Sequence, residues 1–316
     1  MRAVRSTFLL LSLLIGVQTF HILREPKSKN HQEITRLAIL RATANVCKSL
    51  DPEFKKPEVL ETKTLAKACK RKIYASNFET GVKSICYHNV MIDIKHASSE
   101  KHHFDSEKFD GGKELIIKGI ENICSHASSG KFDDARQALG GLLHTLQDFY
   151  SHSNWIELGN DKPYTALISR KTQLTNLAGD KKTCVENPSD HSSGAKLLDS
   201  IIKDKILTSG YFGTKKPKGK CSHGGALDFT TGRGKSWDGT NKDYSESNHG
   251  SLHDKASSVA IDATVELLEK IQRKITNEKF LRLVGLHEEK PKGSLKMKLI
   301  PFKLDSRYKD VEGQPT

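Results

Sequence analysis

Three side chains that can bind a transition metal recur at intervals of four residues: His144, Asp148 and His152. Steps of four place side chains on one face of an α-helix, so two imidazoles and a carboxylate would form one stripe. These groups are suitable ligands for a borderline divalent ion such as zinc. A lone histidine on a helix is usually structural or solvated, but three metal-competent groups on one face favour a metal site.

Other histidines extend this candidate site. His249 and His253 are four residues apart at the start of a predicted helix, where they either bind one ion from one face or are exposed loop residues. Taken singly, His31 and His103 are more often helix-cap or surface residues. Helical bundles, however, build interior metal sites from ligands on several helices. The candidate metal ligands are His31, His103, His144, Asp148, His152, His249 and His253.

The spacing of apolar residues predicts a mainly α domain of about six helices with long irregular connections. Asn30 is the predicted N-cap of the first helix, and Glu33 completes a capping box. The segments 75–110 and 208–248 are predicted to be irregular, and the helical pattern fades after Asn277. Helices are predicted over 30–50, 57–73, 112–125, 132–151, 195–207 and 252–275.

The chain is strongly basic, with a net charge of +13. Such a charge favours an anionic partner, for example phospholipid headgroups, glycans or nucleic acid. The lysine clusters within 215–220 and 290–298 are more typical of solvated loops. Because no basic stripe alternates with aromatic residues, no dedicated nucleic-acid motif is predicted. The expected partner is therefore an anionic extracellular molecule or a phospholipid headgroup.

The first residues have the pattern of a secretory signal, with Arg2 and Arg5 ahead of an apolar run over 8–17. That run is short for a bilayer span, so a signal peptide over 1–19 is favoured over a signal anchor. No second hydrophobic stretch follows, which predicts a secreted, extracellular protein without a transmembrane segment in the mature chain. The expected organisation is a signal peptide over 1–19, a helical domain over 20–280 and a C-terminal tail over 281–316.

All six cysteines follow the predicted signal peptide. An even number of cysteines in an exported chain favours disulfides over thiolate metal sites. Cys184 with Cys221 is the best single pairing, because these residues enclose a long segment that becomes polar and Gly-rich and would gain from covalent closure. The other connectivities stay open.

Several short motifs resemble those of the zinc-dependent phospholipases C. Residues 30–35 are similar to their Thr-His-x-x-Ile segment, 103–105 to their His-Phe-Tyr-Asp element, and 143–148 to their Leu-His-x-x-x-Asp helix. The three-zinc, single-strand-specific nucleases share this helical fold and ligand pattern. The resemblance implies a mainly α helical bundle of the phospholipase C/nuclease type, with long irregular loops and a site for one to three zinc ions.

A narrower resemblance is to the fungal Het-C proteins and to the N-terminal region of von Willebrand factor A domain-containing 7 proteins. It rests on residues 144–155, 209–213, 220–225 and 241–243. These matches run from about residue 28 to residue 275, which is nearly the whole mature chain.

The phospholipase resemblance also implies which residues hold metal. His152 is offset from the next phospholipase histidine, and His253 stands where their closing pair has a glutamate. The phospholipases have a metal-binding aspartate in a segment similar to 74–79, where this chain has Asn77. That departure argues against a full three-metal site. The positions that match the ligand pattern are His31, His103, His144 and Asp148.

Two functions follow from this resemblance. The first is a secreted extracellular domain with a zinc site that acts as a non-catalytic binding or scaffold module, which the altered positions Asn77 and His253 favour. The alternative is a zinc-dependent phosphoester hydrolase, either phospholipase C-like or nuclease-like. In that case zinc would lower the pKa of a bound water to about 7 and stabilise charge on a phosphoryl oxygen. No catalytic residue is assigned.

Overall fold

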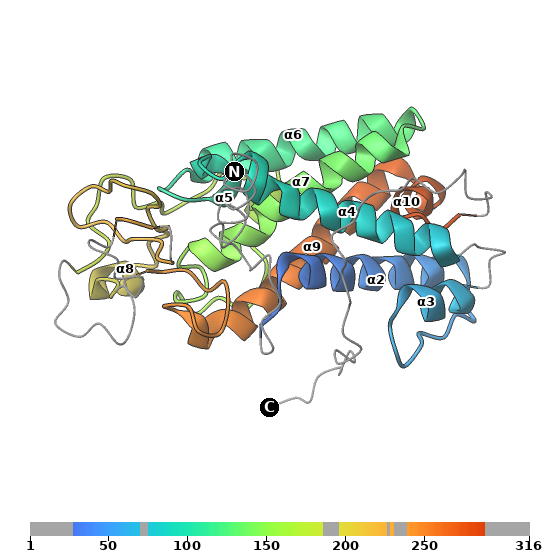
Figure 1. The fold of residues 1–316 in the computed structure, drawn as a ribbon, viewed down its shortest axis with the longest axis horizontal. Helices are drawn as coiled ribbons and strands as arrows, with labels where there is room; N and C mark the ends of the chain where they lie inside the picture. The colour runs from blue at the N-terminus through green and yellow to red at the C-terminus, as the bar shows by residue number, and fades with distance from the viewer. Residues whose placement is uncertain (1–27, 70–74, 186–195, 226–227, 231–238, 288–316) are drawn as a thin grey trace, which may run out of the picture.

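A computed structural model describes residues 28–69, 75–185, 196–225, 228–230 and 239–287 (Figure 1). In these ranges the chain is mainly α-helical, with isolated β-bridges and no extended strand. Two short 3-10 helices, η1 (Thr165–Ile168) and η2 (Gly250–Leu252), interrupt the irregular segments. The α-helices are α2 (His31–Leu50), α3 (Thr62–Ala68), α4 (Ala75–Lys95), α5 (Glu100–His103), α6 (Phe109–Ser128), α7 (Phe132–His152), α8 (Asp199–Lys203), α9 (His253–Ile275) and α10 (Asn277–Val284).

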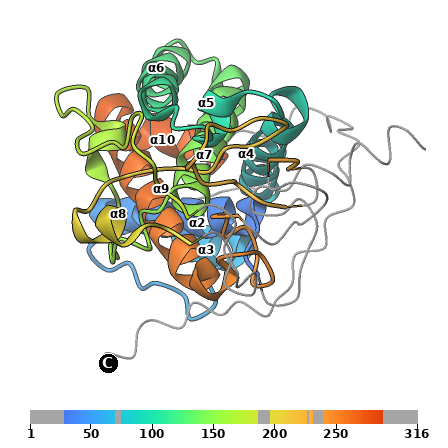
Figure 2. The same cartoon turned by 90° about the vertical axis from the view of Figure 1, so that its left-hand side faces the viewer.

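Helix α7 lies at the centre of the bundle and packs against α2, α4, α6 and α9. The long helices run along the longest dimension of the molecule, whereas α8 and the irregular segments gather at one end (Figure 1). Seen from that end, these segments cross in front of the helix ends (Figure 2). The end of α7 that carries Asp148 and His152 therefore lies on the side of the bundle where the irregular segments are.

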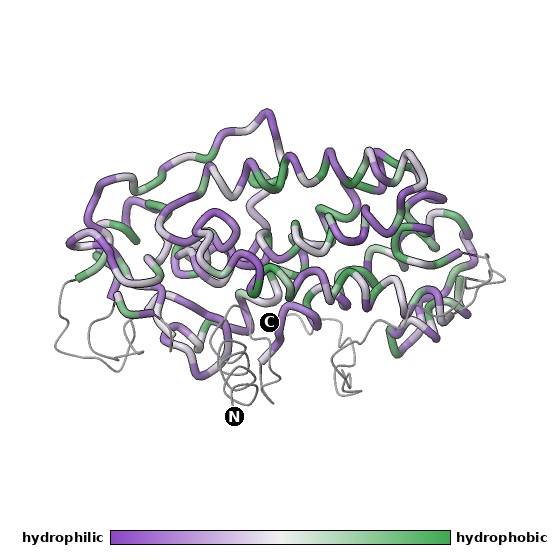
Figure 3. Tube along the Cα trace, turned by 45° about the horizontal axis from the view of Figure 1, so that its top comes forward, coloured by the Kyte–Doolittle hydropathy of each residue, from purple (hydrophilic) through white to green (hydrophobic). Residues whose placement is uncertain are grey.

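The main hydrophobic core is a cluster that every long helix enters, and a second, smaller cluster surrounds Cys184, Cys221 and Ile201 of α8. Apolar and polar residues alternate along the helices (Figure 3), as expected for helices that bury one face. Leu139, Leu143 and Leu146 of α7 are fully or almost fully buried in this cluster, together with Leu267 and Leu268 of α9. The predicted helices over 112–125, 132–151 and 252–275 are confirmed, with small shifts of their ends.

The first predicted helix is confirmed with its cap. The Asn30 side chain accepts hydrogen bonds from the backbone N–H groups of Gln32 and Glu33, both at 3.0 Å. The Glu33 carboxylate in turn accepts from the Asn30 backbone at 3.0 Å. This capping box fixes the start of α2 and therefore the position of His31, its first residue.

The prediction that 75–110 is irregular is wrong, because α4 and α5 occupy most of it. Three apolar side chains on one face of α4, Phe78, Val82 and Ile85, are fully buried. The same face continues in Asn89 and Asp93, which are also fully buried but polar. The apolar pattern stops halfway along the helix because its second half faces a polar interior, and a search for apolar periodicity misses such a helix.

Other element boundaries also differ from the prediction. The helix expected over 57–73 is shorter within the described residues, at α3, and the one expected over 195–207 is reduced to α8. After Asn277 the chain forms α10, whose buried residues are followed by the buried Leu286. The packed body thus extends past residue 280, the expected end of the domain. The predicted signal peptide and most of the predicted tail lie outside the described residues.

Two disulfides cross-link the chain. Cys184 and Cys221 are bonded, as predicted, and Cys47 is bonded to Cys69. Cys86 and Cys124 are thiols, and burial raises the pKa of Cys86 to about 12, which keeps it protonated.

None of the described helices is both long and apolar enough to cross a bilayer.

Candidate metal centre

The stripe predicted on α7 is present and buried. His144, Asp148 and His152 are on this helix, and none of the three side chains is exposed to solvent. A carboxylate in this position requires compensating partners, because an isolated buried charge is strongly disfavoured. The partners of Asp148 come from three different helices.

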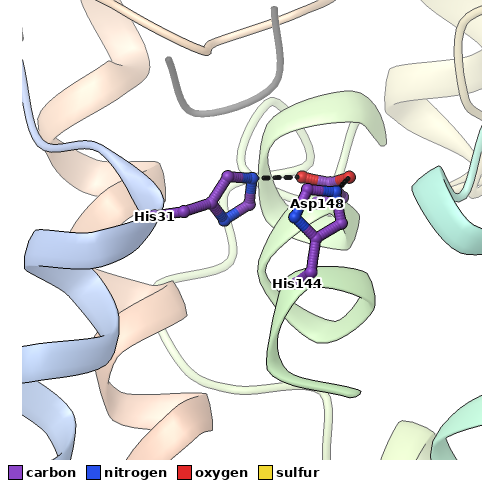
Figure 4. Close-up of side chains that lie close together, drawn as sticks. All are labelled: His31, His144 and Asp148. Carbon is purple, nitrogen blue, oxygen red and sulfur yellow. Dashed lines mark ion pairs between the residues drawn. The ribbon is translucent and has the colours of Figure 1, made fainter. Parts of the chain in front are cut away.

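Asp148 is at the centre of a group of imidazoles. Its Oδ1 is 3.0 Å from Nε2 of His31, the first residue of α2 (Figure 4). Its Oδ2 is 2.8 Å from Nδ1 of His103, at the end of α5, and 3.0 Å from Nε2 of His144, one turn earlier on α7. The structure therefore brings together His31, His103, His144 and Asp148. The two outermost of these, His31 and Asp148, are more than a hundred residues apart in the sequence.

A fifth member of the group, Asp93 of α4, is absent from the sequence prediction. Its Oδ1 lies 3.3 Å from Nε2 of His144, and that nitrogen is 3.2 Å from Nδ1 of His103. Two buried sets of donor atoms can each hold a metal ion here, and they share His144. The two sets are His31 with His144 and Asp148, and Asp93 with His103 and His144.

The placement of Asp93 also corrects the inference from Asn77. Asn77 lies near the start of α4, where its carbonyl oxygen is close to Gly285. Asp93 is 16 residues further along the same helix, a rise of roughly 24 Å. Asn77 therefore does not occupy the carboxylate position of this centre, and the argument that it removes a ligand does not apply. The sequence gives no signal for Asp93; the structure shows it on the buried face of α4, one turn after Asn89.

Helix packing brings Asp93 close to α7. At Gly140 the backbone of α7 lies close to the backbone of α4. A Cβ at this position would lie 2.5 Å from the carbonyl oxygen of Ile85 and 2.8 Å from the backbone nitrogen of Asn89. Only a residue without a side chain allows this separation without a shift of one helix.

The second nitrogen of each imidazole in the centre contacts an oxygen that accepts hydrogen bonds. Nδ1 of His31 is 2.7 Å from Oε1 of Gln147, and Nδ1 of His144 is 3.2 Å from Oδ1 of Asn89. Nε2 of His103 is 3.1 Å from the backbone carbonyl of His96. Since oxygens of this kind only accept, these three ring nitrogens carry the protons.

The amide orientations are consistent with these tautomers. The NH2 group of Asn89 donates to Thr35 at 3.0 Å and to Gln147 at 3.1 Å, and the NH2 group of Gln147 donates to Thr35 at 2.9 Å. The amide oxygens are thereby left to face His31 and His144. Histidines that bind metals are held in this way, with the ring N–H donated to a fixed acceptor behind the ligand.

The atoms that converge inside the centre are therefore all acceptors when the imidazoles are neutral. They are one nitrogen from each of three histidines and the carboxylate oxygens of Asp93 and Asp148. Acceptors at about 3 Å from one another repel unless a proton or a cation lies between them. The chemistry of this donor set fits a divalent cation.

The local electrostatics without a cation lead to the same conclusion. Burial alone would lower the pKa of His144, but Asp148 and Asp93 outweigh it and raise the pKa to about 10. Burial would raise the pKa of Asp148, but the neighbouring imidazoles, His144 foremost, hold it well below its usual range. The site stabilises positive charge strongly, either as protons or as a metal ion.

His152 belongs to a different group from the one predicted. It contacts Asp105 and Asp243, and together with Asp105 and His223 it forms a third buried set that can hold a metal ion. His223 and Asp243 were not predicted as ligands, although both are within the motifs that carry the Het-C-like resemblance. Asp105 was not predicted as a ligand either, although it comes directly after His103 and Phe104 in the motif over 103–105.

His249 and His253 lie outside all three groups. Nδ1 of His249 is 2.5 Å from the buried carboxylate of Glu157. Both ring nitrogens of His253 contact the main chain: Nε2 accepts from the backbone N–H of Lys29 at 2.9 Å, and Nδ1 donates to the carbonyl of Lys242 at 2.8 Å. The predicted pair of ligands therefore contacts separate partners.

Comparison with known proteins places the chain in a family. A family model described as the VWA7 N-terminal domain matches residues 60–281. The chain belongs to this family. Von Willebrand factor A domain-containing protein 7 of Rattus norvegicus is 32% identical over 286 residues, and that of Mus musculus is 31% identical over 287 residues. Each match covers 84% of this chain and 31% of the relative.

The relative from Homo sapiens is 30% identical over 306 residues, which is 89% of this chain and 33% of that protein. The chain thus spans about a third of the length of these relatives. No solved structure matches it. The matched residues 60–281 include Asp93, His103, His144, Asp148 and the whole third group.

Proposed function

We propose that this VWA7 N-terminal-type domain is an exported, non-catalytic module whose helices are held together by zinc. The observation that carries the proposal is burial. His31, Asp93, His103, His144 and Asp148 are each exposed by 2% or less. Structural zinc sites are closed in this way, whereas catalytic sites keep a coordination position open to substrate.

Zinc is the proposed metal because the donor set combines imidazole nitrogens with carboxylate oxygens. Zinc binds both kinds of ligand, and calcium or magnesium would require more oxygen donors. His31, Asp93, His103, His144 and Asp148 would hold it, joining α2, α4, α5 and α7 at one point. Two disulfides support export to an oxidising compartment, where such bonds form and persist.

The proposed partner of the module is anionic. The net charge of +13 would attract an acidic extracellular molecule or phospholipid headgroups, and the association should weaken as salt is raised. This is a proposal about the surface as a whole, since the metal centre itself is enclosed.

One observation favours a zinc-dependent phosphoester hydrolase as the second candidate. The two oxygens of Asp148 face different histidines, Oδ1 toward His31 and Oδ2 toward His103 and His144. A carboxylate placed in this way is able to bridge two metal ions, as in many phosphoesterases. Zinc bound there would supply a Lewis acid and a hydroxide near neutral pH. The likeness to the phospholipase C/nuclease fold is part of this second proposal.

The two candidates differ in metal content and turnover. Wild type and Asp148→Asn, produced from the secreted chain, would be analysed for zinc by mass spectrometry and assayed with a chromogenic phosphodiester, with and without chelator. The module proposal expects zinc that the variant loses and no turnover by either protein. Hydrolysis by wild type that chelator abolishes and that zinc restores would overturn it and support the hydrolase. Loss of all zinc from wild type on mild dialysis would contradict both.

A further inference from the structure

The third group of donor atoms lies where the irregular part of the chain meets the helical bundle. Asp105 follows α5, and His152 is the last residue of α7. His223 and Asp243 come from the irregular segments beyond α8. We infer that Asp105, His152, His223 and Asp243 form a second, separate zinc site that fastens these irregular segments to the end of α7.

All four side chains are buried, with an exposed fraction of 6% or less. Donor atoms of Asp105, His152 and His223 lie within 4.8 Å of one another. Asp243 lies beside this set of three, with its Oδ1 3.2 Å from Nε2 of His152, and is the proposed fourth ligand. Four ligands drawn from both parts of the chain are the number that a closed zinc site needs.

The hydrogen bonds of the two histidines leave one nitrogen of each for a ligand. Nδ1 of His152 donates to the backbone carbonyl of His103 at 2.8 Å and also lies 3.2 Å from Oδ1 of Asp105, whereas its Nε2 faces Asp243. Nδ1 of His223 donates to the carbonyl of Gly224 at 2.7 Å. A carbonyl oxygen only accepts, so both Nδ1 atoms carry protons and both Nε2 atoms are left as acceptors in the neutral ring. Metal-binding histidines are commonly oriented by such bonds to carbonyl groups.

One atom of the group, Nε2 of His223, is buried and makes no hydrogen bond to any described residue. The nearest carboxylate oxygen in the group, Oδ1 of Asp105, is 4.0 Å away, which is too long for a hydrogen bond. A buried polar atom without a partner costs free energy, so its position calls for an explanation. A cation between His223 and Asp105 would provide it.

The charges of the group also favour a divalent ion. Two carboxylates and two neutral imidazoles have a net charge of −2, which one zinc ion balances. The hydroxyl of Ser151 donates to Oδ1 of Asp243 at 2.6 Å and holds that carboxylate in place. The competing arrangement is an imidazolium of His152 between Asp105 and Asp243, each 3.2 Å from one of its ring nitrogens. That arrangement leaves Nε2 of His223 buried without a partner among the described residues, and an imidazolium of His223 would bury a charged N–H without an acceptor.

His103 connects the two centres without being shared as a ligand. Its ring faces Asp148 in the first centre, whereas its backbone carbonyl orients His152 in the second. The second site depends on different side chains from those of the proposed function, so either can be wrong while the other stands.

The test is the zinc content of the full secreted chain after dialysis against a weak chelator. We expect His223→Gln to contain one zinc fewer than wild type. It should still retain the zinc of the first centre, which a second variant, His144→Gln, should lose. His249→Gln is the matched control, because His249 lies near the same segments but contacts Glu157 rather than this group; its zinc content should equal that of wild type. Full zinc content in His223→Gln would overturn the inference.

A second measurement uses the unsubstituted protein and does not depend on whether the variant folds. The backbone N–H groups of Thr240 and Asn241 donate to the carbonyls of Ser222 and His223, beside the proposed site. When zinc is returned to the metal-free chain, hydrogen exchange at these two amides should slow. Magnesium should not slow it. Exchange that is the same with and without zinc would contradict the proposed role of fastening the segments.

Discussion

Asp93 and His144 lie on different helices and meet in the interior, with Oδ1 of the carboxylate 3.3 Å from Nε2 of the imidazole. Neither is exposed to solvent. This contact makes α4 part of the candidate metal centre, although the sequence analysis predicted an irregular segment where this helix lies.

Asp93→Asn should weaken zinc binding in the first centre by at least tenfold, because it replaces a charged ligand by a neutral amide of the same shape. A competition titration with a chromophoric chelator would measure the change. Asn77→Ala, a substitution near the other end of α4, should leave the affinity unchanged. Equal affinity of Asp93→Asn and wild type would exclude the carboxylate as a ligand.

Removal of metal should lower the melting temperature. A ligand present at about a thousand times its dissociation constant adds roughly 4 kcal/mol to the native state, which corresponds to a shift of roughly 10 °C for a chain of this size. Calorimetry with and without chelator would measure it. Zinc, but not magnesium, should restore the original value. A melting temperature that is the same in chelator would show that the metal does not stabilise the fold.

Zinc binding should release protons at neutral pH. In the metal-free centre, burial lowers the pKa of His144, but Asp148 and Asp93 outweigh it and raise the pKa to about 10. The imidazole therefore carries a proton that zinc must displace, and the apparent affinity should rise about tenfold per pH unit for each proton released. Isothermal titration in two buffers with different ionisation enthalpies would count these protons. The same heat in both buffers would contradict the prediction.

Gln147→Leu should weaken zinc binding by about 10- to 100-fold, although Gln147 is not a proposed ligand. Its Oε1 accepts from Nδ1 of His31 at 2.7 Å and fixes the direction of that ring. Thr264→Val removes a longer contact of the same amide, at 3.4 Å, and should have a much smaller effect. The chelator competition would rank the two variants. Equal effects would mean that the amide does not orient His31.

Two adjacent glycines of α7 provide a matched test of helix packing. Gly140→Ala would place Cβ 2.5 Å from a backbone oxygen of α4, whereas Gly141→Ala would meet the movable end of the Ile92 side chain at 3.2 Å. The first should destabilise the protein by about 1–3 kcal/mol or more, and the second should be neutral or stabilise it by up to about 1 kcal/mol. Urea unfolding would measure both. The prediction fails if the two variants unfold at the same concentration.

The sequence predicted the centre better where ligands share a helix than where they do not. His144 and Asp148 follow from their spacing alone, because a helical period places them on one face. The convergence of His31 and His103 on Asp148 was expected from the family resemblance, and the structure shows it. Asp93 had no such signal, since its neighbours on the buried face of α4 change from apolar to polar at Asn89.

The prediction of His249 and His253 as ligands shows the limit of spacing as evidence. A four-residue step is compatible with a shared ion, but it does not specify what faces the two rings. His253 instead holds the chain entering α2 through the backbone N–H of Lys29, and His249 contacts Glu157. The long-range packing that decides these partners has no local pattern in the sequence.

The Cys184–Cys221 bridge ends two residues before His223. If His223 is a ligand of the second site, oxidation of this cysteine pair helps to place it, and the order of maturation follows. Chain that is made and kept under reducing conditions should load the first centre but fill the second poorly. Disulfide formation would then come before the last zinc is taken up.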